Sequence, residues 1–228
     1  MANAFYLGLG TVIRFQGKDR CKVFNNLCTQ DLRQLAHGQA VETFVTDVKG
    51  RTFGHGIAAA WGEEAFLITV PGQAERLVPH FDRYIIREDA QVSDVSAMFP
   101  FWLFRNRETA ALGLGVPIDA LPAAKNCVSL PIGNVETLVM HAPWLNDDSI
   151  LVLAPGDAQS AALRDHLGEQ WMESDLVIRA AWEHDRISAF WPWYGVDLDE
   201  RNLPQEVDRN VSAISFNKGC YLGQETIA

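Results

Sequence analysis

Short apolar runs separated by polar turns dominate the first third of the chain. Runs with the length and composition of β-strands cover residues 12–15, 42–46, 51–60 and 65–70. Residues 47–50, with the sequence Asp-Val-Lys-Gly, lie between the second and third runs and favour a tight turn with a left-handed glycine. This order predicts an antiparallel meander.

Helical spacing of apolar residues marks the two ends of this meander. Residues 19–32 begin with Asp19, a residue type that favours the first position of a helix. Residues 73–86 place Leu77 and Phe81 on one side of a second helix, in which we expect Pro79 to cause a kink. Residues 91–105, which follow, are predicted to be mostly extended.

The second half of the chain repeats the order strand, strand, helix. Strands are predicted over residues 135–141 and 149–153, and helices over residues 157–171 and 175–189. This order in both halves predicts an α+β fold with antiparallel sheets rather than a doubly wound sheet. Residues 110–125, rich in Ala, Gly, Leu and Pro, are interpreted as the junction between two subdomains, 1–110 and 111–228.

Composition and charge narrow the class of protein. Apolar residues make up 48% of the 228 residues and charged residues 21%, which excludes a disordered chain. The net charge of −10 disfavours a general nucleic-acid binder, which needs a basic surface for phosphates. No apolar run approaches the ~20 residues of a membrane span, and the first residues lack the pattern of a secretory signal. We therefore expect a cytoplasmic protein with neither nucleic acid nor membrane as a direct partner.

The cysteines and histidines give no pattern of a metal site. Cys21, Cys28, Cys127 and Cys220 show no C-x-x-C spacing, and the six histidines lack the spacing of metal ligands, so we predict no metal. Cys220 differs from the other cysteines because it lies between two glycines and two residues from Lys218. If the two side chains converge, the lysine charge raises the thiolate fraction of Cys220. A plain structural loop is the alternative that these residues leave open.

The run at residues 218–225, K-G-C-Y-L-G-Q-E, resembles the signature of the YgfZ-type folate-binding proteins. These proteins are relatives of the glycine-cleavage T-protein, an aminomethyltransferase. Residues 46–51 (T-D-V-K-G-R), 194–197 (Y-G-V-D) and 203–206 (L-P-Q-E) are similar to other segments of the family. The resemblance covers roughly residues 5 to 228.

The resemblance implies fused α+β subdomains around a central cavity that binds tetrahydrofolate or a derivative. It also implies a role in maintaining certain iron–sulfur proteins and the tRNA modifications that depend on them, with iron–sulfur enzymes or assembly factors as partners. Cys220 is expected to be the reactive thiol and Lys218 its electrostatic partner. The expected folate-binding residues are Asp47, Tyr194, Asp197, Glu206, Gln224 and Glu225. Further candidates are Asp199 and Glu200 for the pterin, and Arg186 and Arg201 for the carboxylates of the folate tail.

Two departures from the T-protein pattern argue against aminomethyl transfer, and a third concerns the length of the chain. The position of its acidic pair falls at Gly54 and His55, and the position of its pterin-binding glutamate falls near Ser188. The family usually continues past the signature into a small C-terminal β domain, whereas this sequence stops at Ala228. We expect either a short member of the family, without that domain, or a fragment of a longer protein, and in both cases an incomplete cavity. We therefore predict a folate-binding accessory protein. The alternatives are a folate-dependent aminomethyltransferase and a binding protein without thiol chemistry.

Overall fold

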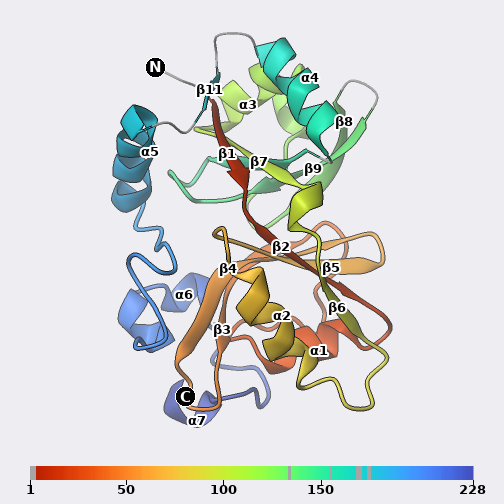
Figure 1. Ribbon diagram of the computed structural model, residues 1–228, viewed down its shortest axis with the longest axis vertical. Helices are drawn as coiled ribbons and strands as arrows, with labels where there is room; N and C mark the ends of the chain where they lie inside the picture. Colours follow the sequence, from red (N-terminus) through yellow and green to blue (C-terminus); the bar gives the residue numbers. More distant parts are fainter. Residues whose placement is uncertain (1–3, 133–134, 155, 168–170, 174–175, 228) are drawn as a thin grey trace. The chain divides into compact units, whose positions relative to one another are not determined.

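A computed structural model describes residues 4–132, 135–154, 156–167, 171–173 and 176–227 (Figure 1). The chain forms two compact units, each made of separate stretches of sequence. Unit 1 comprises residues 1–10 and 96–191, and unit 2 comprises residues 11–95 and 192–228. This division differs from the expected one at residue 110. The junction predicted at residues 110–125 is wrong, because that segment lies wholly within unit 1.

Unit 2 contains a five-stranded sheet in the order β3-β4-β5-β2-β6. Its strands are β2 (Thr11–Gln16), β3 (Ala40–Thr46), β4 (Thr52–Trp61), β5 (Glu64–Thr69) and β6 (Gln91–Asp94). All neighbouring strands run antiparallel, and the four strands predicted from the first apolar runs are confirmed. The side-chain period of two gives this sheet two apolar faces.

Helices α1 (Arg20–Asn26) and α2 (Ala74–Asp82) cover one face of this sheet (Figure 1). The ring of Phe15 stacks on Phe24 of α1 at 4.2 Å and meets the edge of Phe81 of α2 at 4.8 Å between centroids. Helix α1 is shorter than predicted, because the chain after Asn26 turns to pair with β3. There the Thr29 N–H donates to the carbonyl of Phe44 at 2.9 Å.

The C-terminal segment of unit 2 packs against the other face of the sheet. Val45 belongs to the core under α1 and α2, whereas its neighbour Phe44 packs with Tyr194, Ile214 and Tyr221. This segment carries the 3₁₀ helix η4 (Pro204–Val207) and the short helices α6 (Asn210–Ala213) and α7 (Gln224–Ile227). Both faces of the sheet are therefore covered by elements of the same unit.

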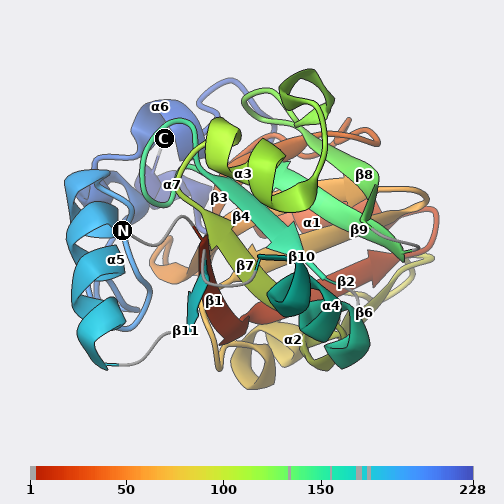
Figure 2. The same cartoon turned by 90° about the horizontal axis from the view of Figure 1, so that it is seen from above.

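Unit 1 contains a six-stranded sheet in the order β11-β1-β7-β10-β9-β8 (Figure 2). The strands are β1 (Ala4–Leu9), β7 (Pro100–Phe104), β8 (Cys127–Ile132), β9 (Val135–His141), β10 (Ile150–Leu153) and β11 (Trp171–Glu173). Strand β11 runs parallel to β1, and the other pairs are antiparallel. The predicted α+β class with antiparallel sheets is thus confirmed.

The helices of unit 1 are α3 (Arg107–Leu114), α4 (Asp157–Leu167) and α5 (Leu176–Ser188), with 3₁₀ turns η1 (Ser96–Met98) and η2 (Ile118–Ala120). Helices α3 and α4 share a core with Trp102 and Phe104 of β7. The helix predicted over residues 157–171 ends at Leu167, and the expected start of the next helix at Asp175 lies outside the described residues. Over the described part of the chain, no helix has the length and hydropathy that crossing a bilayer requires.

Candidate functional site

Two of the sequence motifs meet backbone to backbone in unit 2. Gly50, in the turn between β3 and β4, and Gly223, in the signature run, both have positive φ, +75° and +78°. A Cβ atom on Gly223 would lie 2.4 Å from the Cα of Gly50, and one on Gly50 would lie 2.5 Å from the carbonyl oxygen of Gly223. Only glycine permits both the conformation and this approach. The Thr46 hydroxyl also donates to the Leu222 carbonyl at 2.7 Å.

Lys218 anchors the same loop to the end of α1. Its Nζ atom donates to the backbone carbonyls of Asn25, Cys28 and Gln30 at 2.8, 2.7 and 2.7 Å. The Tyr221 ring centroid lies 4.8 Å from the same nitrogen. Burial lowers the pKa of Lys218 to about 8, although the neighbouring Cys28 and Asp31 favour the charged form.

This geometry corrects the expected pairing of Lys218 with Cys220. An ammonium group has three N–H donors, and here all three point to carbonyls of the segment that follows α1. The ammonium group of Lys218 is therefore held at these carbonyls, and none of its N–H donors is left for the thiol of Cys220. The reactive role of Cys220 itself stays a prediction.

Cys220 is the exposed member of the four cysteines. Cys28 and Cys127 are buried and Cys21 is half-buried. Burial raises the pKa of the Cys28 thiol to about 12 and also raises that of Cys21, which keeps both as thiols at neutral pH. The signature loop therefore fixes its own backbone through Lys218 and Gly223 and presents Cys220 between them.

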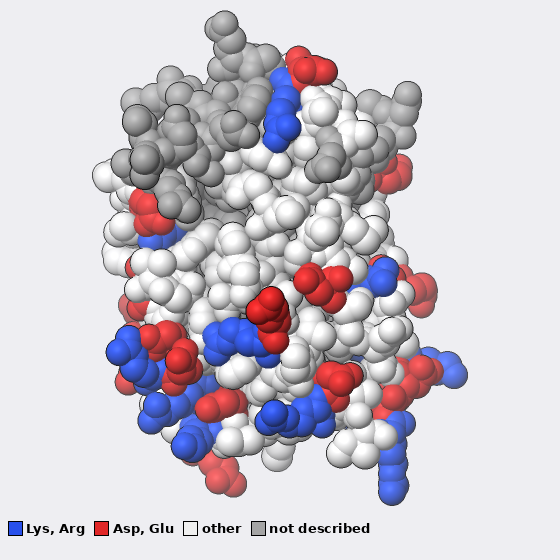
Figure 3. Space-filling view, viewed as in Figure 1, with Lys and Arg blue, Asp and Glu red and all other residues white. Residues whose placement is uncertain are grey.

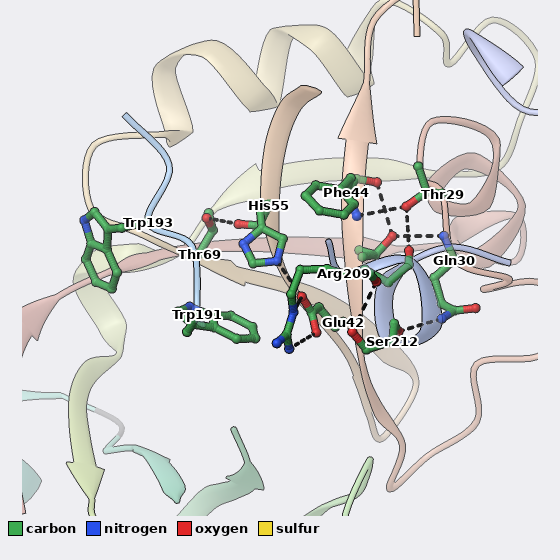
Figure 4. A network of polar contacts seen from close by, with 12 residues as sticks. Thr29, Gln30, Glu42, Phe44, His55, Thr69, Trp191, Trp193, Arg209 and Ser212 are labelled. Carbon is green, nitrogen blue, oxygen red and sulfur yellow. Dashed lines mark hydrogen bonds and ion pairs between the residues drawn. The ribbon is translucent and has the colours of Figure 1, made fainter. Parts of the chain in front are cut away.

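A buried charged network joins β3, β4 and the C-terminal segment of unit 2 (Figure 4). The Arg209 guanidinium donates to both oxygens of Glu42, from Nε to Oε1 at 2.8 Å and from Nη2 to Oε2 at 2.6 Å. His55 Nε2 lies 2.8 Å from Oε1 of the same carboxylate and must carry the proton, because a carboxylate only accepts. Burial alone raises the pKa of Glu42, but the bonds from His55 and Arg209 outweigh it and lower the pKa to about 2.

His55 is one of the two positions at which the sequence comparison expected an acid, and the structure brings the carboxylate of Glu42 to it. Glu42 comes from β3, two residues along from Phe44, whose ring lies 4.8 Å from the His55 ring. Sequence reasoning missed both Glu42 and Arg209. The available signal was a single acid at the start of an otherwise apolar strand, and nothing in the sequence pointed to Arg209, 167 residues away.

Most of the predicted folate-binding acids accept hydrogen bonds from backbone N–H groups of the turns in which they lie. Asp47 Oδ1 accepts from the N–H groups of Lys49 and Arg51, both at 2.8 Å. Asp197 Oδ2 accepts from the Trp193 N–H at 2.7 Å, and Glu206 Oε2 caps η4 through the Leu203 N–H at 3.1 Å.

Of the remaining folate-binding candidates, some form hydrogen bonds or ion pairs with nearby residues, and one is exposed. Gln224 Oε1 accepts from the Tyr221 N–H at 3.3 Å within the signature loop, whereas Glu225 is exposed. Asp199 forms an ion pair with Arg201, and Glu200 Oε2 lies 3.5 Å from the Tyr194 hydroxyl. None of these contacts by itself assigns a ligand.

The predicted role of Arg186 on the folate tail does not fit its surroundings in unit 1. Its side chain is buried, and it donates to the Trp191 carbonyl at 2.7 Å and to Glu183 at 2.6 Å. Ser188, at the expected glutamate position, ends α5.

A cation between aromatic rings was also missed by the sequence reasoning. The Arg76 guanidinium of α2 lies 4.2 Å from the ring centroid of Phe53 and 4.8 Å from that of Tyr194. Arg76 and Phe53 are half-buried, and Tyr194 is buried. The predicted residue Tyr194 therefore belongs to a cluster that combines positive charge with flat apolar surfaces, which is the chemistry an anionic aromatic ligand requires.

Charged side chains of both signs are intermingled in the lower part of the view in Figure 3. Lys18 and Lys22 of unit 2, for example, pair with Asp89 and Glu88. Within the ranges that the structure describes, no group of three or more His, Cys, Asp or Glu side chains is arranged to hold a metal ion.

Comparisons with known proteins agree with this fold. No protein-family model matches the chain. A chloroplastic protein of Arabidopsis thaliana that is named a transferase is 29% identical over 229 residues, which are 95% of this chain and 50% of that protein. An aminomethyltransferase of Rubrobacter xylanophilus is 23% identical over 220 residues, 94% of this chain and 58% of that protein.

The structural comparison covers nearly the whole chain. The crystal structure of the glycine cleavage system aminomethyltransferase T from Bartonella henselae matches with a TM-score of 0.76 at 15% identity, over 99% of this chain and 63% of that one. The chain thus has the T-protein fold and is similar in sequence to aminomethyltransferase-like proteins, and it spans about half the length of the curated relatives it matches. A YgfZ-type affiliation stays a prediction.

Proposed function

We propose that this chain, which has an aminomethyltransferase-like fold, binds reduced folate and acts in the cytoplasm as an accessory factor for iron–sulfur proteins and the tRNA modifications that depend on them. The observation that carries the proposal is the presentation of Cys220. The loop around it is fixed by a buried lysine and by a contact between two glycines, yet the thiol itself is exposed. A loop with only a packing role has no need of an exposed thiol.

Aminomethyl transfer is disfavoured by the charge state of the acid in the matching region. His55 bonds to the carboxylate of Glu42, whose pKa of about 2 keeps it ionised at neutral pH. An ionised carboxylate in a bidentate pair with Arg209 is a poor proton donor. Gly54, the other matching position, has no side chain to contribute.

The residues of unit 2 fit a folate ligand in part. Arg76 with Phe53 and Tyr194 offers a cation and aromatic surfaces to an anionic, aromatic molecule. A bidentate clamp on the pterin needs both oxygens of a carboxylate, and Glu206 already uses Oε2 to cap η4. We therefore propose binding of tetrahydrofolate or a derivative at micromolar rather than nanomolar affinity.

Complementation of cells that lack the endogenous protein tests the thiol role. We expect Cys220→Ser to lose the activity of iron–sulfur enzymes, whereas Cys21→Ser, the matched control, retains it. Both variants should accumulate to nearly the wild-type level, since Cys220 is exposed and Cys21 is only half-buried at the edge of the core. Full complementation by Cys220→Ser contradicts the proposed thiol role.

A further inference from the structure

The ammonium group of Lys218 sits in a cage that resembles a binding site for a small cation. Three carbonyl oxygens lie 2.7 to 2.8 Å from Nζ, and the face of Tyr221 lies on a further side. The lysine is only 5% exposed, so water does not replace these contacts. Carbonyl oxygens and an aromatic face are the groups that bind an ammonium ion.

The backbone around the cage is positioned independently of the lysine. Asn25 belongs to the last turn of α1, where the helix dipole favours a positive charge, and its carbonyl also accepts from the Cys28 N–H at 3.3 Å. Thr29 lies between Cys28 and Gln30, whose carbonyls accept from Lys218. It is tied to β3 through Phe44 and to the C-terminal segment through its hydroxyl, which donates to the Ala213 carbonyl at 2.6 Å. Gln30 Nε2 donates to the Ser212 carbonyl at 2.9 Å (Figure 4).

The cage also joins three parts of unit 2 that are distant in sequence. Leu222 N–H donates to the Asn26 carbonyl at 2.8 Å, and the Thr46 N–H donates to the Leu27 carbonyl at 2.9 Å. With Lys218, these bonds hold the signature loop, the end of α1 and the end of β3 together. The charged group is the one component of this junction that a soluble ion can imitate.

We propose that Lys218 is a positioning residue that acts as a tethered ammonium ion, and that its cage of three carbonyls is a cation site that accepts a free alkylammonium ion when the side chain is shortened. The cage holds residues 25–30 against the signature loop and thereby sets the position of Cys220. Only this last link rests on the proposed function. The cation site itself does not depend on the proposed function.

Rescue of Lys218→Ala by propylammonium chloride tests the inference. The readout is the rate of N-ethylmaleimide labelling of Cys28, which is fully buried and supplies one of the cage carbonyls. We expect labelling of Cys28 to accelerate by about tenfold or more in the variant, since one bond to a charged group is worth at least a factor of ten. Millimolar propylammonium should restore at least half of the protection, and wild type should not respond.

Two controls separate the cation site from general stability. Tetramethylammonium, with equal charge but no N–H donors, should not protect Cys28. Leu67→Ala, which weakens the core of the same unit, should expose Cys28 without any response to propylammonium. Lys218→Met keeps an apolar stem in the space that the alanine variant leaves empty. In this variant Cys28 should also become exposed, and propylammonium should not restore its protection. It replaces the alanine variant if that variant does not fold.

Equal protection by propylammonium and tetramethylammonium overturns the inference, as does equal rescue of Leu67→Ala or unchanged protection of Cys28 in Lys218→Met. Because Cys28 is the reporter, these results do not depend on any reaction of Cys220. A failure of Cys220→Ser in cells therefore remains distinguishable from a failure of the cation site.

Discussion

At the scale of single residues, burial and partners assign different tasks to groups that look alike in the sequence. Cys28 and Cys220 are both cysteines near Lys218, yet one is buried and the other exposed. Glu42 and Glu206 are both acids of unit 2, yet the first is held ionised by His55 and Arg209 and the second caps a helix. Chemistry at this scale follows from the environment of the side chain rather than from its type.

Cys220 should be the fastest thiol in the native protein. Exposure lets an alkylating agent reach it, whereas burial shields Cys28 and Cys127 and raises the pKa of Cys28 to about 12. Peptide mapping after brief treatment with iodoacetamide measures the order of labelling. If Cys220 reacts no faster than Cys127, the thiol is not available for the proposed role.

In Glu42→Gln, the free energy of unfolding should fall less steeply between pH 5 and pH 2 than in the wild type. The folded-state pKa of Glu42 is about 2, below its ordinary value of 4.5, so its contribution is complete above pH 5 and is lost as pH falls toward 2. The shift corresponds to about 3 kcal/mol at neutral pH. Urea unfolding at a series of pH values measures this, with Glu63→Gln, an exposed turn residue, as the control. An acid limb parallel to that of the wild type contradicts the assigned ion pair.

At the scale of elements, the sequence predicted those that are regular and failed where long-range contacts decide. The strands of unit 2 follow from their apolar runs. Strand β8 was missed because it lies at a sheet edge, contains Pro131 and is mostly half-exposed. The predicted helix 19–32 ends early because Thr29 finds its partner in β3, which no local pattern reveals.

The candidate site shows the same limit. The turn with Gly50 and the signature run were each recognisable, and the left-handed glycine predicted in that turn is confirmed. The contact between the two glycines, Gly50 and Gly223, depends on the tertiary structure and cannot be read from local sequence. The same holds for the pairing of Glu42 with Arg209 and for the carbonyl cage of Lys218. Sequence reasoning therefore located the loop but assigned its lysine to the wrong partner.

Gly223→Ala should destabilise unit 2 much more than Gly62→Ala. Both glycines have positive φ, which costs an alanine about 1 to 2 kcal/mol, but a Cβ at Gly62 meets nothing within 4 Å. At Gly223 the Cβ meets the backbone of Asp47 and Gly50 at 2.4 Å, which adds a further ~1–3 kcal/mol for overpacking. Denaturant midpoints of the two variants measure the difference, and equal losses contradict the close approach.

At the scale of the whole molecule, two units of separate sequence stretches carry an aminomethyltransferase-like fold. Unit 2 contains the signature loop, the charged network of Glu42 and the aromatic cluster of Arg76. The similarity to aminomethyltransferases is a similarity of fold and of sequence.

The purified chain should not support glycine cleavage. Gly54 has no side chain, and the carboxylate of Glu42, with a pKa of about 2, is ionised at neutral pH and paired with Arg209. The assay combines the chain with the other components of the cleavage system and tetrahydrofolate, with an authentic T-protein as positive control. Methylene-tetrahydrofolate above the level without the chain contradicts this expectation.

The most direct test of the central claim is a calorimetric titration of the chain with tetrahydrofolate. We predict saturable binding with a micromolar Kd, because the loss of one charge-assisted hydrogen bond to the pterin costs roughly 1.5–3 kcal/mol, or about one to two decades in affinity. Arg76→Gln should weaken this binding, whereas Arg87→Gln, at an exposed position, should leave it unchanged. The absence of heat and of any thermal shift at millimolar ligand contradicts the proposal that this chain binds folate.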